Sequence, residues 1–91
     1  MQFRRFDANL LFVLDALLQE NSVTLAAEKL GRSPSAISHS LSNLRDIFGD
    51  KLFVRDGQKL VPTPKSADIK QDVHDLVHNI EKLIPPIKEQ N

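Results

Sequence analysis

Apolar residues at helical spacing predict two helices in the first thirty positions of the chain. Leucines and valines between residues 10 and 18 fall on one broad side of a helix that begins after Asp7, a residue suited to cap it. Asn21 and Ser22 interrupt the pattern, and either Ser22 or Thr24 can cap a short second helix. Gly31 ends that helix, because glycine readily adopts the left-handed conformation that closes helices.

The third predicted helix covers residues 34–48 and has the clearest boundaries. Ser33 is a favourable cap, Pro34 fits the first helical position, and Gly49 ends the helix. Apolar residues repeat along one face, at Ile37, Leu41, Leu44 and Phe48. The opposite face carries small polar side chains, at Ser35, Ser38, His39 and Ser42. A helix with this outer face has the shape and polarity to enter a DNA major groove.

A β-hairpin is predicted next. Residues 52–55 and 59–61 are short β-prone runs on either side of Asp56-Gly57, which is a strong turn signal. Two helices, a recognition-type third helix and a hairpin, in that order, predict a mainly α fold of the winged helix-turn-helix type. Pro62, Thr63 and Pro64 separate this domain, residues 1–63, from a second segment, residues 64–91.

The second segment predicts one long helix from Pro64 to Ile84, with Thr63 as its cap, ended by Pro85-Pro86. Apolar residues along it step by four and three positions, which is heptad spacing: Ile69, Val73, Leu76, Ile80 and Leu83, widened by Val77 and Ile84. This stripe has two compatible interpretations. It can pair with a second copy as a coiled coil, or it can pack on the first helix of its own chain.

Composition changes this picture mainly through the placement of charge. The chain has 91 residues and no net charge, but residues 29–65 hold seven basic and three acidic groups, whereas residues 67–91 hold three and five. Because nucleic-acid binding draws on phosphate neutralisation, the positive middle segment is the candidate binding region. No cysteine is present, which excludes disulfides and thiolate metal sites. The N-terminal run, interrupted by Asp15 and Glu20, is neither a signal peptide nor a membrane span.

Two strings in the middle of the chain resemble a known family. TLAAEKLGRSPSAISHSLSNLR and FGDKLFVRDGQKLVPTP look like the N-terminal DNA-binding domain of LysR-type transcriptional regulators, in the branch of the nodulation and naphthalene-degradation regulators. The matching features are Ala26-Ala27, Ser33, Ala36-Ile37-Ser38 and Leu52-Phe53-Val54-Arg55. Two positions depart from the family pattern, since Ser66 stands where glycine is frequent and Arg45 where glutamate is common. The first bears on how the linker helix starts and the second on local charge.

The resemblance implies sequence-specific binding of double-stranded promoter DNA, with the third helix in the major groove and the wing in the minor groove. Nine residues are expected to contact DNA: Arg32, Ser33, Pro34, Ser35, Ser38, His39, Ser42, Arg55 and Lys59. Serine and histidine can pair with base edges or phosphates, and an arginine suits a narrow A·T minor groove. Asp46 also projects outward, so the N-terminal half of the helix is expected to penetrate deepest. The alternatives are a merely solvated polar face and an Arg55 paired with Asp50 or Asp56.

The resemblance also implies a homodimer on an inverted repeat, and a tetramer is conceivable in a full-length protein. The linker helices are expected to pair antiparallel through Ile69, Val73, Leu76, Val77, Ile80, Leu83 and Ile84. The family continues into a domain that binds a small-molecule effector; that domain is absent here, so a fragment or a natural minimal form is expected, with no cofactor of its own. A cytoplasmic bacterial protein associated with the nucleoid is implied.

Other functions have less support. Zero net charge favours a protein-interaction module that keeps the fold without reading DNA. An enzyme is not expected, because no nucleophile, histidine and acid are placed by a motif, and no glycine-rich phosphate loop is present. His74 and His78 have a metal-binding spacing on a helix, but no third ligand accompanies them, so no metal is expected.

Overall fold

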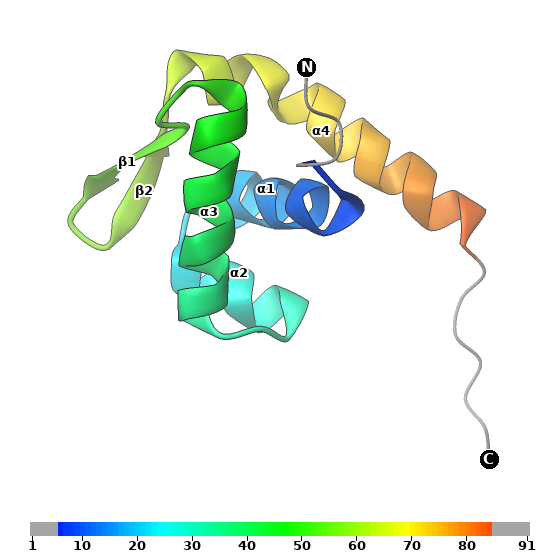
Figure 1. Ribbon diagram of the computed structural model, residues 1–91, viewed down its shortest axis with the longest axis horizontal. Helices are drawn as coiled ribbons and strands as arrows, with labels where there is room; N and C mark the ends of the chain where they lie inside the picture. The colour runs from blue at the N-terminus through cyan, green and yellow to red at the C-terminus, as the bar shows by residue number, and fades with distance from the viewer. Residues whose placement is uncertain (1–5, 85–91) are drawn as a thin grey trace.

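The computed structural model describes residues 6–84, which form four helices and one two-stranded hairpin (Figure 1). The elements are α1 (Ala8–Glu20), α2 (Val23–Leu30), α3 (Pro34–Phe48), β1 (Phe53–Asp56), β2 (Lys59–Pro62) and α4 (Pro64–Leu83). This order confirms the predicted mainly α, winged helix-turn-helix fold with a long helix after it. Helix α4 ends at Leu83, one residue before the predicted end at Ile84, and the predicted stop at Pro85-Pro86 lies outside the described residues.

Each of the four helices begins at a side-chain cap, in the order Asp7, Ser22, Ser33 and Thr63. For α2 the structure decides between the two options. The Ser22 hydroxyl accepts a hydrogen bond from the Leu25 N–H at 3.1 Å, and Thr24 lies inside the first turn. The helices α1, α2 and α3 each end at a residue in the left-handed conformation: Asn21, Gly31 and Gly49. Local sequence signals therefore set these boundaries.

Helix α1 lies at the centre of the domain, with α2, α3 and α4 packed around it (Figure 1). Eight of its 13 residues are buried, which is the pattern of a helix with apolar residues on most sides. Leu14 and Leu17 are fully covered, and Ile37 and Leu44 of α3 pack into the same core. This core fixes α3 by its apolar face and leaves the opposite face in solvent.

The hairpin has a simple antiparallel register in which Arg55 pairs with Leu60 and Asp56 pairs with Lys59. Both strands end one residue later than predicted, and β1 also starts one residue later, because Leu52 has left-handed backbone geometry, with φ of 65°. That conformation cannot continue a β-strand. Leu52 is instead a buried corner residue between α3 and the wing.

Helix α4 divides the predicted heptad stripe between two environments. Val73 and Val77 are buried in the core against α1, and Ile69 and Ile80 are partly buried beside them. The remaining three residues are exposed, with Leu76 at 52%, Leu83 at 83% and Ile84 at 57%. Packing on the chain's own first helix is therefore present, and it narrows the surface left for a partner copy.

No helix within residues 6–84 is long and apolar enough to cross a membrane.

Candidate nucleic-acid interface

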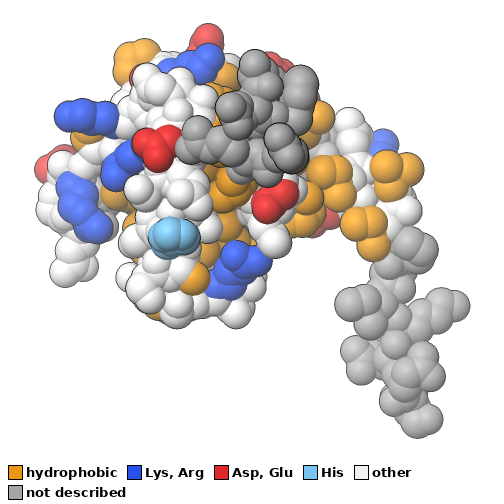
Figure 2. Space-filling model, viewed as in Figure 1, with side chains coloured by type: hydrophobic (Ala, Val, Ile, Leu, Met, Phe, Trp, Pro, Cys, Tyr) orange, Lys and Arg blue, Asp and Glu red, His pale blue; other side chains and the backbone are white. Residues whose placement is uncertain are grey.

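The outer face of α3 and its cap, Ser33, together carry all six residues predicted to read the major groove. These side chains are exposed: Ser33, Pro34, Ser35, Ser38, His39 and Ser42. Figure 2 shows α3 at the front of the molecule, with a histidine facing the viewer and basic side chains beside it. The structure thus brings the predicted groove-facing residues together on one continuous surface.

The N-terminus of α3 combines two hydroxyl groups with few free backbone donors, because Pro34 has no N–H and the Ala36 N–H is bound by the cap. Ser33 Oγ accepts a hydrogen bond from the Ala36 N–H at 3.1 Å and lies 3.4 Å from Ser35 Oγ. The first turn of a helix also carries partial positive charge, which suits a phosphate. Because the Ser33 oxygen accepts this capping bond, the outward role left to its hydroxyl is mainly that of a donor.

Arg32 lies in the turn between α2 and α3 and is tied to the start of α1. Its Nη2 donates a hydrogen bond to Asn9 Oδ1 at 2.9 Å. A guanidinium group has several further N–H donors, so this contact leaves Arg32 able to bind a phosphate as well. The bond also orients the exposed side chain, which sits close to the recognition helix.

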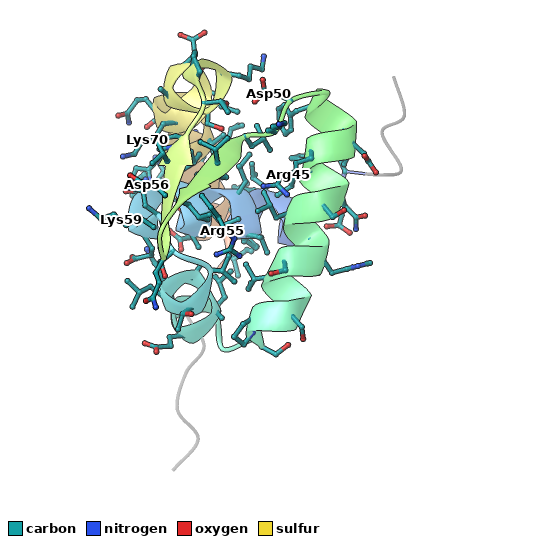
Figure 3. All side chains as sticks on the ribbon, turned by 90° about the vertical axis from the view of Figure 1, so that its left-hand side faces the viewer. Arg45, Asp50, Arg55, Asp56, Lys59 and Lys70 are labelled. Carbon is teal, nitrogen blue, oxygen red and sulfur yellow. The ribbon has the colours of Figure 1, made fainter. Side chains whose placement is uncertain are left out.

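The two wing residues predicted to contact DNA lie on opposite faces of the hairpin. Arg55 shares its face with Phe53 and with its cross-strand partner Leu60, both of which are buried. Lys59 pairs with Asp56 on the other face, where Val54 and Val61 are exposed. Figure 3 shows Arg55 on the side of the hairpin toward α3 and Lys59 pointing away from it.

Within residues 6–84, Arg55 forms no ion pair with Asp50 or Asp56, which had been the alternative to a DNA-binding role. Both Arg55 and Lys59 are exposed. Arg55 is thus exposed on the side of the hairpin toward α3 (Figure 3). Lys59 lies on the other face, directly opposite Asp56.

Arg45 has a role that the sequence did not reveal. Its Nε donates to the backbone carbonyl of Lys51 at 2.7 Å, and its Nη2 donates to the carbonyl of Phe53 at 3.0 Å. The sequence reading treated Arg45 only as a change in local charge. The available signal was its position in the last turn of α3, since the chain reverses into the wing a few residues later. Figure 3 shows Arg45 extending from α3 toward the hairpin.

Asp50 organises the base of the wing. Its Oδ2 accepts hydrogen bonds from the Leu52 N–H at 2.8 Å and from the Thr63 hydroxyl at 2.6 Å. The Thr63 bond, followed by the Leu52 bond and the nearby charge of Lys65, holds the pKa of the Asp50 carboxyl below its ordinary value. The carboxylate is thus a structural acceptor.

Ser66, the other departure from the family pattern, is fully buried at the start of α4. Its hydroxyl donates a 2.6 Å hydrogen bond to the carbonyl oxygen of Leu52. A glycine at this position would leave that carbonyl with one donor fewer. The departure therefore bears on the start of the linker helix, as expected, and links it to the wing.

The two histidines of α4, which have a metal-binding spacing, are both exposed. His74 Nδ1 lies 3.2 Å from Oδ1 of the buried Asp15, so this side chain connects α4 to α1. In the described part of the chain, no group of three or more histidine, cysteine or acidic side chains is arranged to hold a metal ion.

An exposed polar helix beside a basic hairpin, both fixed on a small helical core, defines a winged helix-turn-helix domain of the DNA-binding class. Residues 8–66 match the family of bacterial regulatory helix-turn-helix proteins of the lysR family. The chain belongs to this family, which consists of transcription regulators and not of enzymes.

Relatives of known role agree with this assignment. The chain is 41% identical over 81 residues to nodulation protein D 1 of Rhizobium meliloti (strain 1021), covering 89% of this chain and 26% of that protein. It is 45% identical over 78 residues to the HTH-type transcriptional regulator SyrM 2 of Sinorhizobium fredii (strain NBRC 101917 / NGR234), covering 86% and 23%. The chain thus spans about a quarter of the length of these relatives.

Solved structures share the fold over most of the chain. The probable transcriptional regulator PA0477 from Pseudomonas aeruginosa matches with a TM-score of 0.80 and 36% identity, over 98% of this chain and 31% of that one. A complex of the BenM DNA-binding domain with benA site 1 DNA matches with a TM-score of 0.77 and 26% identity, over 86% and 88%. These matches confirm the predicted class, a DNA-binding domain of the LysR family.

Proposed function

We propose that this chain binds double-stranded promoter DNA in a sequence-specific way, with α3 in the major groove and the wing in the minor groove. The single observation that carries the proposal is that the exposed, polar outer face of α3 is accompanied by an exposed Arg55 on the side of the hairpin toward α3 (Figure 3). Membership of a family of transcription regulators, and likeness to a DNA-bound domain, support the same reading.

The chemistry of α3 suits base edges and phosphates together. Ser35, Ser38 and Ser42 can donate or accept hydrogen bonds, and His39 can donate to a guanine acceptor or to a phosphate. Pro34 can contact a thymine methyl group. Negative charge at Asp46 lies toward the C-terminal end of the helix, so the N-terminal half is the part that enters the groove.

The wing contributes a charged side chain of a different kind. A guanidinium group is attracted by the strong negative potential of a narrow A·T minor groove. Arg55 is exposed, belongs to the strand face nearer α3, and forms no ion pair with the neighbouring acids in the described residues. Lys59 and Arg32 supply phosphate contacts.

The protein acts as a homodimer on an inverted repeat in this proposal. Leu76, Leu83 and Ile84 form an exposed apolar edge on α4, while Val73 and Val77 hold the helix on α1. Figure 2 shows apolar side chains along α4, on the part of the molecule away from the hairpin. A second copy of the same helix would cover this edge, and two-fold symmetry would place two α3 helices on two half-sites.

The place of action follows from the partner. A regulator of this family would bind promoter DNA on the bacterial nucleoid, in the cytoplasm. In a longer protein, a small-molecule effector would bind outside the residues of this chain, and such a protein could assemble into a tetramer.

A second candidate is an interaction module that does not read DNA, and the zero net charge favours it. The dependence of DNA affinity on salt concentration distinguishes the two candidate functions. Binding through phosphates releases counterions, so the logarithm of DNA affinity should fall steeply with the logarithm of salt concentration. An interaction module should show no such dependence with DNA.

A fluorescence titration tests the proposal by measuring the affinity of the protein for two DNAs. One is the region upstream of the protein's own gene, and the other is scrambled DNA of equal length. Ser38→Ala and His39→Ala should each weaken binding to the upstream DNA, by roughly 5- to 100-fold for a lost base contact. Ser40→Ala, on the flank of the same helix, and His78→Ala, on α4, are the matched controls and should bind like the wild type. Equal binding of both DNAs, with no loss in the two α3 variants, would contradict specific readout.

A further inference from the structure

We propose that Arg45 is a positioning residue that sets the orientation of the wing, and with it Arg55, relative to the recognition helix. This inference rests on the proposed function for its effect on DNA binding. Its structural part concerns the DNA-free protein and stands independently.

The geometry of the Arg45 contact fixes a direction as well as a distance. Two different nitrogens of one planar guanidinium donate to the carbonyls of Lys51 and Phe53, at 2.7 Å and 3.0 Å. These carbonyls flank Leu52, the corner from which β1 begins. A rigid fork held at two points resists rotation of the strand, which a single ammonium donor cannot do.

The hairpin is attached to the domain through its buried Phe53 and Leu60 and through a small number of hydrogen bonds, of which those from Arg45 come from α3. A two-stranded ribbon is marginally stable in isolation. Its backbone packs chiefly within itself and against α4, with little close approach to α3. On the other strand, the Leu60 N–H donates to the carbonyl of Asn21 at 2.9 Å, which ties β2 to the turn after α1. Arg45 is the corresponding tie from α3 to β1.

The position of Arg55 links the Arg45 hydrogen bonds to DNA binding. Arg55 follows Phe53 by two residues on the same strand face, a step of about 6.7 Å along β1. A rotation of the strand at Phe53 therefore displaces the Arg55 guanidinium directly. The minor-groove contact requires the guanidinium at a set distance from α3, since α3 is seated in the adjacent major groove at the same time.

Two other roles for Arg45 give different results. Because its side chain is exposed, it could itself bind a phosphate, and its loss would then act independently of Arg55. Alternatively, its hydrogen bonds could support only the stability of the fold, and its loss would then leave the DNA affinity of the folded protein unchanged.

The first measurement uses the 91-residue chain without DNA. Residual dipolar couplings of the backbone amides report the orientation of the hairpin relative to α3 in the wild type, in Arg45→Met and in Arg45→Lys. The wing couplings in Arg45→Met should no longer fit the wild-type orientation, whereas those of α1 and α3 should. Arg45→Lys should recover part of the wild-type pattern, since one carbonyl can still be reached. Unchanged wing couplings in Arg45→Met would overturn the proposal, whatever the protein binds.

The second measurement is a double-mutant cycle on DNA affinity, made at a temperature where all variants are folded. Arg55→Gln should weaken wild-type binding by roughly tenfold or more. In the Arg45→Met background, the Arg55→Gln substitution should weaken binding by about twofold or less, because the wing is already displaced. Lys82→Met, which removes one positive charge from the far end of α4, is the control and should leave the Arg55 effect intact.

The outcomes of the cycle are distinct from failure of the proposed function. Additive losses would identify Arg45 as a direct DNA contact and overturn the positioning role, as would unchanged affinity in Arg45→Met. If the wild type itself showed no sequence preference, the proposed function would fail, and the dipolar couplings would still decide whether Arg45 orients the wing.

Discussion

The Ser66 hydroxyl donates a 2.6 Å hydrogen bond to the carbonyl oxygen of Leu52, and this contact joins the start of α4 to the base of the wing. The same carbonyl accepts the Thr63 N–H at 3.0 Å, and the Leu52 N–H donates to Asp50 at 2.8 Å. Both backbone groups of Leu52 are thus paired. These bonds hold a leucine in the left-handed conformation, which costs an L-residue roughly 1–2 kcal/mol.

Removing the hydroxyl of Ser66 should weaken this junction. Ser66→Ala should lower the free energy of unfolding by about 1 kcal/mol, because a buried hydrogen bond is lost while the Leu52 carbonyl keeps its bond from Thr63. Urea unfolding followed by circular dichroism measures the change. Ser38→Ala, at an exposed site, is the matched control and should change stability by less than about 0.5 kcal/mol. Equal stabilities of the two variants would contradict the role of Ser66.

The left-handed backbone of Leu52 predicts an unusual order of stability for the glycine and alanine variants at this position. Leu52→Ala should destabilise the protein by about 2–5 kcal/mol, since it removes a fully buried side chain. Leu52→Gly should be no less stable than Leu52→Ala, because glycine adopts a φ of 65° without the steric penalty. At ordinary helix and strand positions glycine is instead the less stable of the two. Urea unfolding measures the stability of both variants. A glycine variant that is less stable than the alanine variant by about 1 kcal/mol would contradict a left-handed backbone at Leu52.

The lowered pKa of the Asp50 carboxyl group predicts that the folded protein loses stability in acid. Its pKa in the folded protein lies below the ordinary carboxyl value, so the folded state favours the ionised form. The stability that this provides is present above the unfolded pKa of about 4 and is lost as the pH falls through the folded pKa. Asp50→Asn should therefore show a shallower decline of unfolding free energy than the wild type below about pH 4.

Urea unfolding at a series of pH values from neutral to strongly acidic measures this difference. Asp72→Asn, which removes an exposed carboxylate from α4, is the matched control. If Asp50→Asn loses stability as steeply as the wild type, then the hydrogen bonds from Thr63 and Leu52 are not the source of the acid dependence.

Helix α4 should separate stability from self-association. Val77→Ala should lower the free energy of unfolding by about 2 kcal/mol, because Val77 is 6% exposed and packs in the core. Leu83→Ser, at an 83% exposed position, should leave monomer stability nearly unchanged and reduce dimer formation. Sedimentation equilibrium and urea unfolding together give both quantities. A Leu83→Ser variant that dimerises like the wild type would remove this edge of α4 from the proposed dimer contact.

Much of the fold could be predicted because it depends on local signals. Asp7, Ser33 and Thr63 cap helices as expected. The Asp56-Gly57 signal marked the hairpin, but the turn itself is Gly57-Gln58, because Asp56 is the last residue of β1 and pairs with Lys59. The strand boundary at Leu52 could not be predicted, since nothing in a leucine indicates a left-handed backbone. That conformation results from hydrogen bonds to residues elsewhere in the chain, namely Asp50, Thr63 and Ser66.

The placement of the candidate site residues on α3 was predictable to a similar extent. The spacing of α3 placed its polar residues on the outer face, because the apolar face is determined by a helical repeat. The division of the α4 stripe was not predictable, since a heptad pattern does not say which edge meets α1. The role of Arg45 was also hidden, because it bonds to backbone carbonyls, which every residue has.

Methylation protection by dimethyl sulfate on the upstream DNA tests the central claim most directly, because it reports guanine in the major groove and adenine in the minor groove in one experiment. The account predicts two half-sites related by two-fold symmetry, each with protected guanines beside protected adenines of an A·T tract. Arg55→Gln should remove the adenine protection and leave the guanine protection. Absence of protection, or protection that is the same on scrambled DNA, would contradict sequence-specific reading by α3 and the wing.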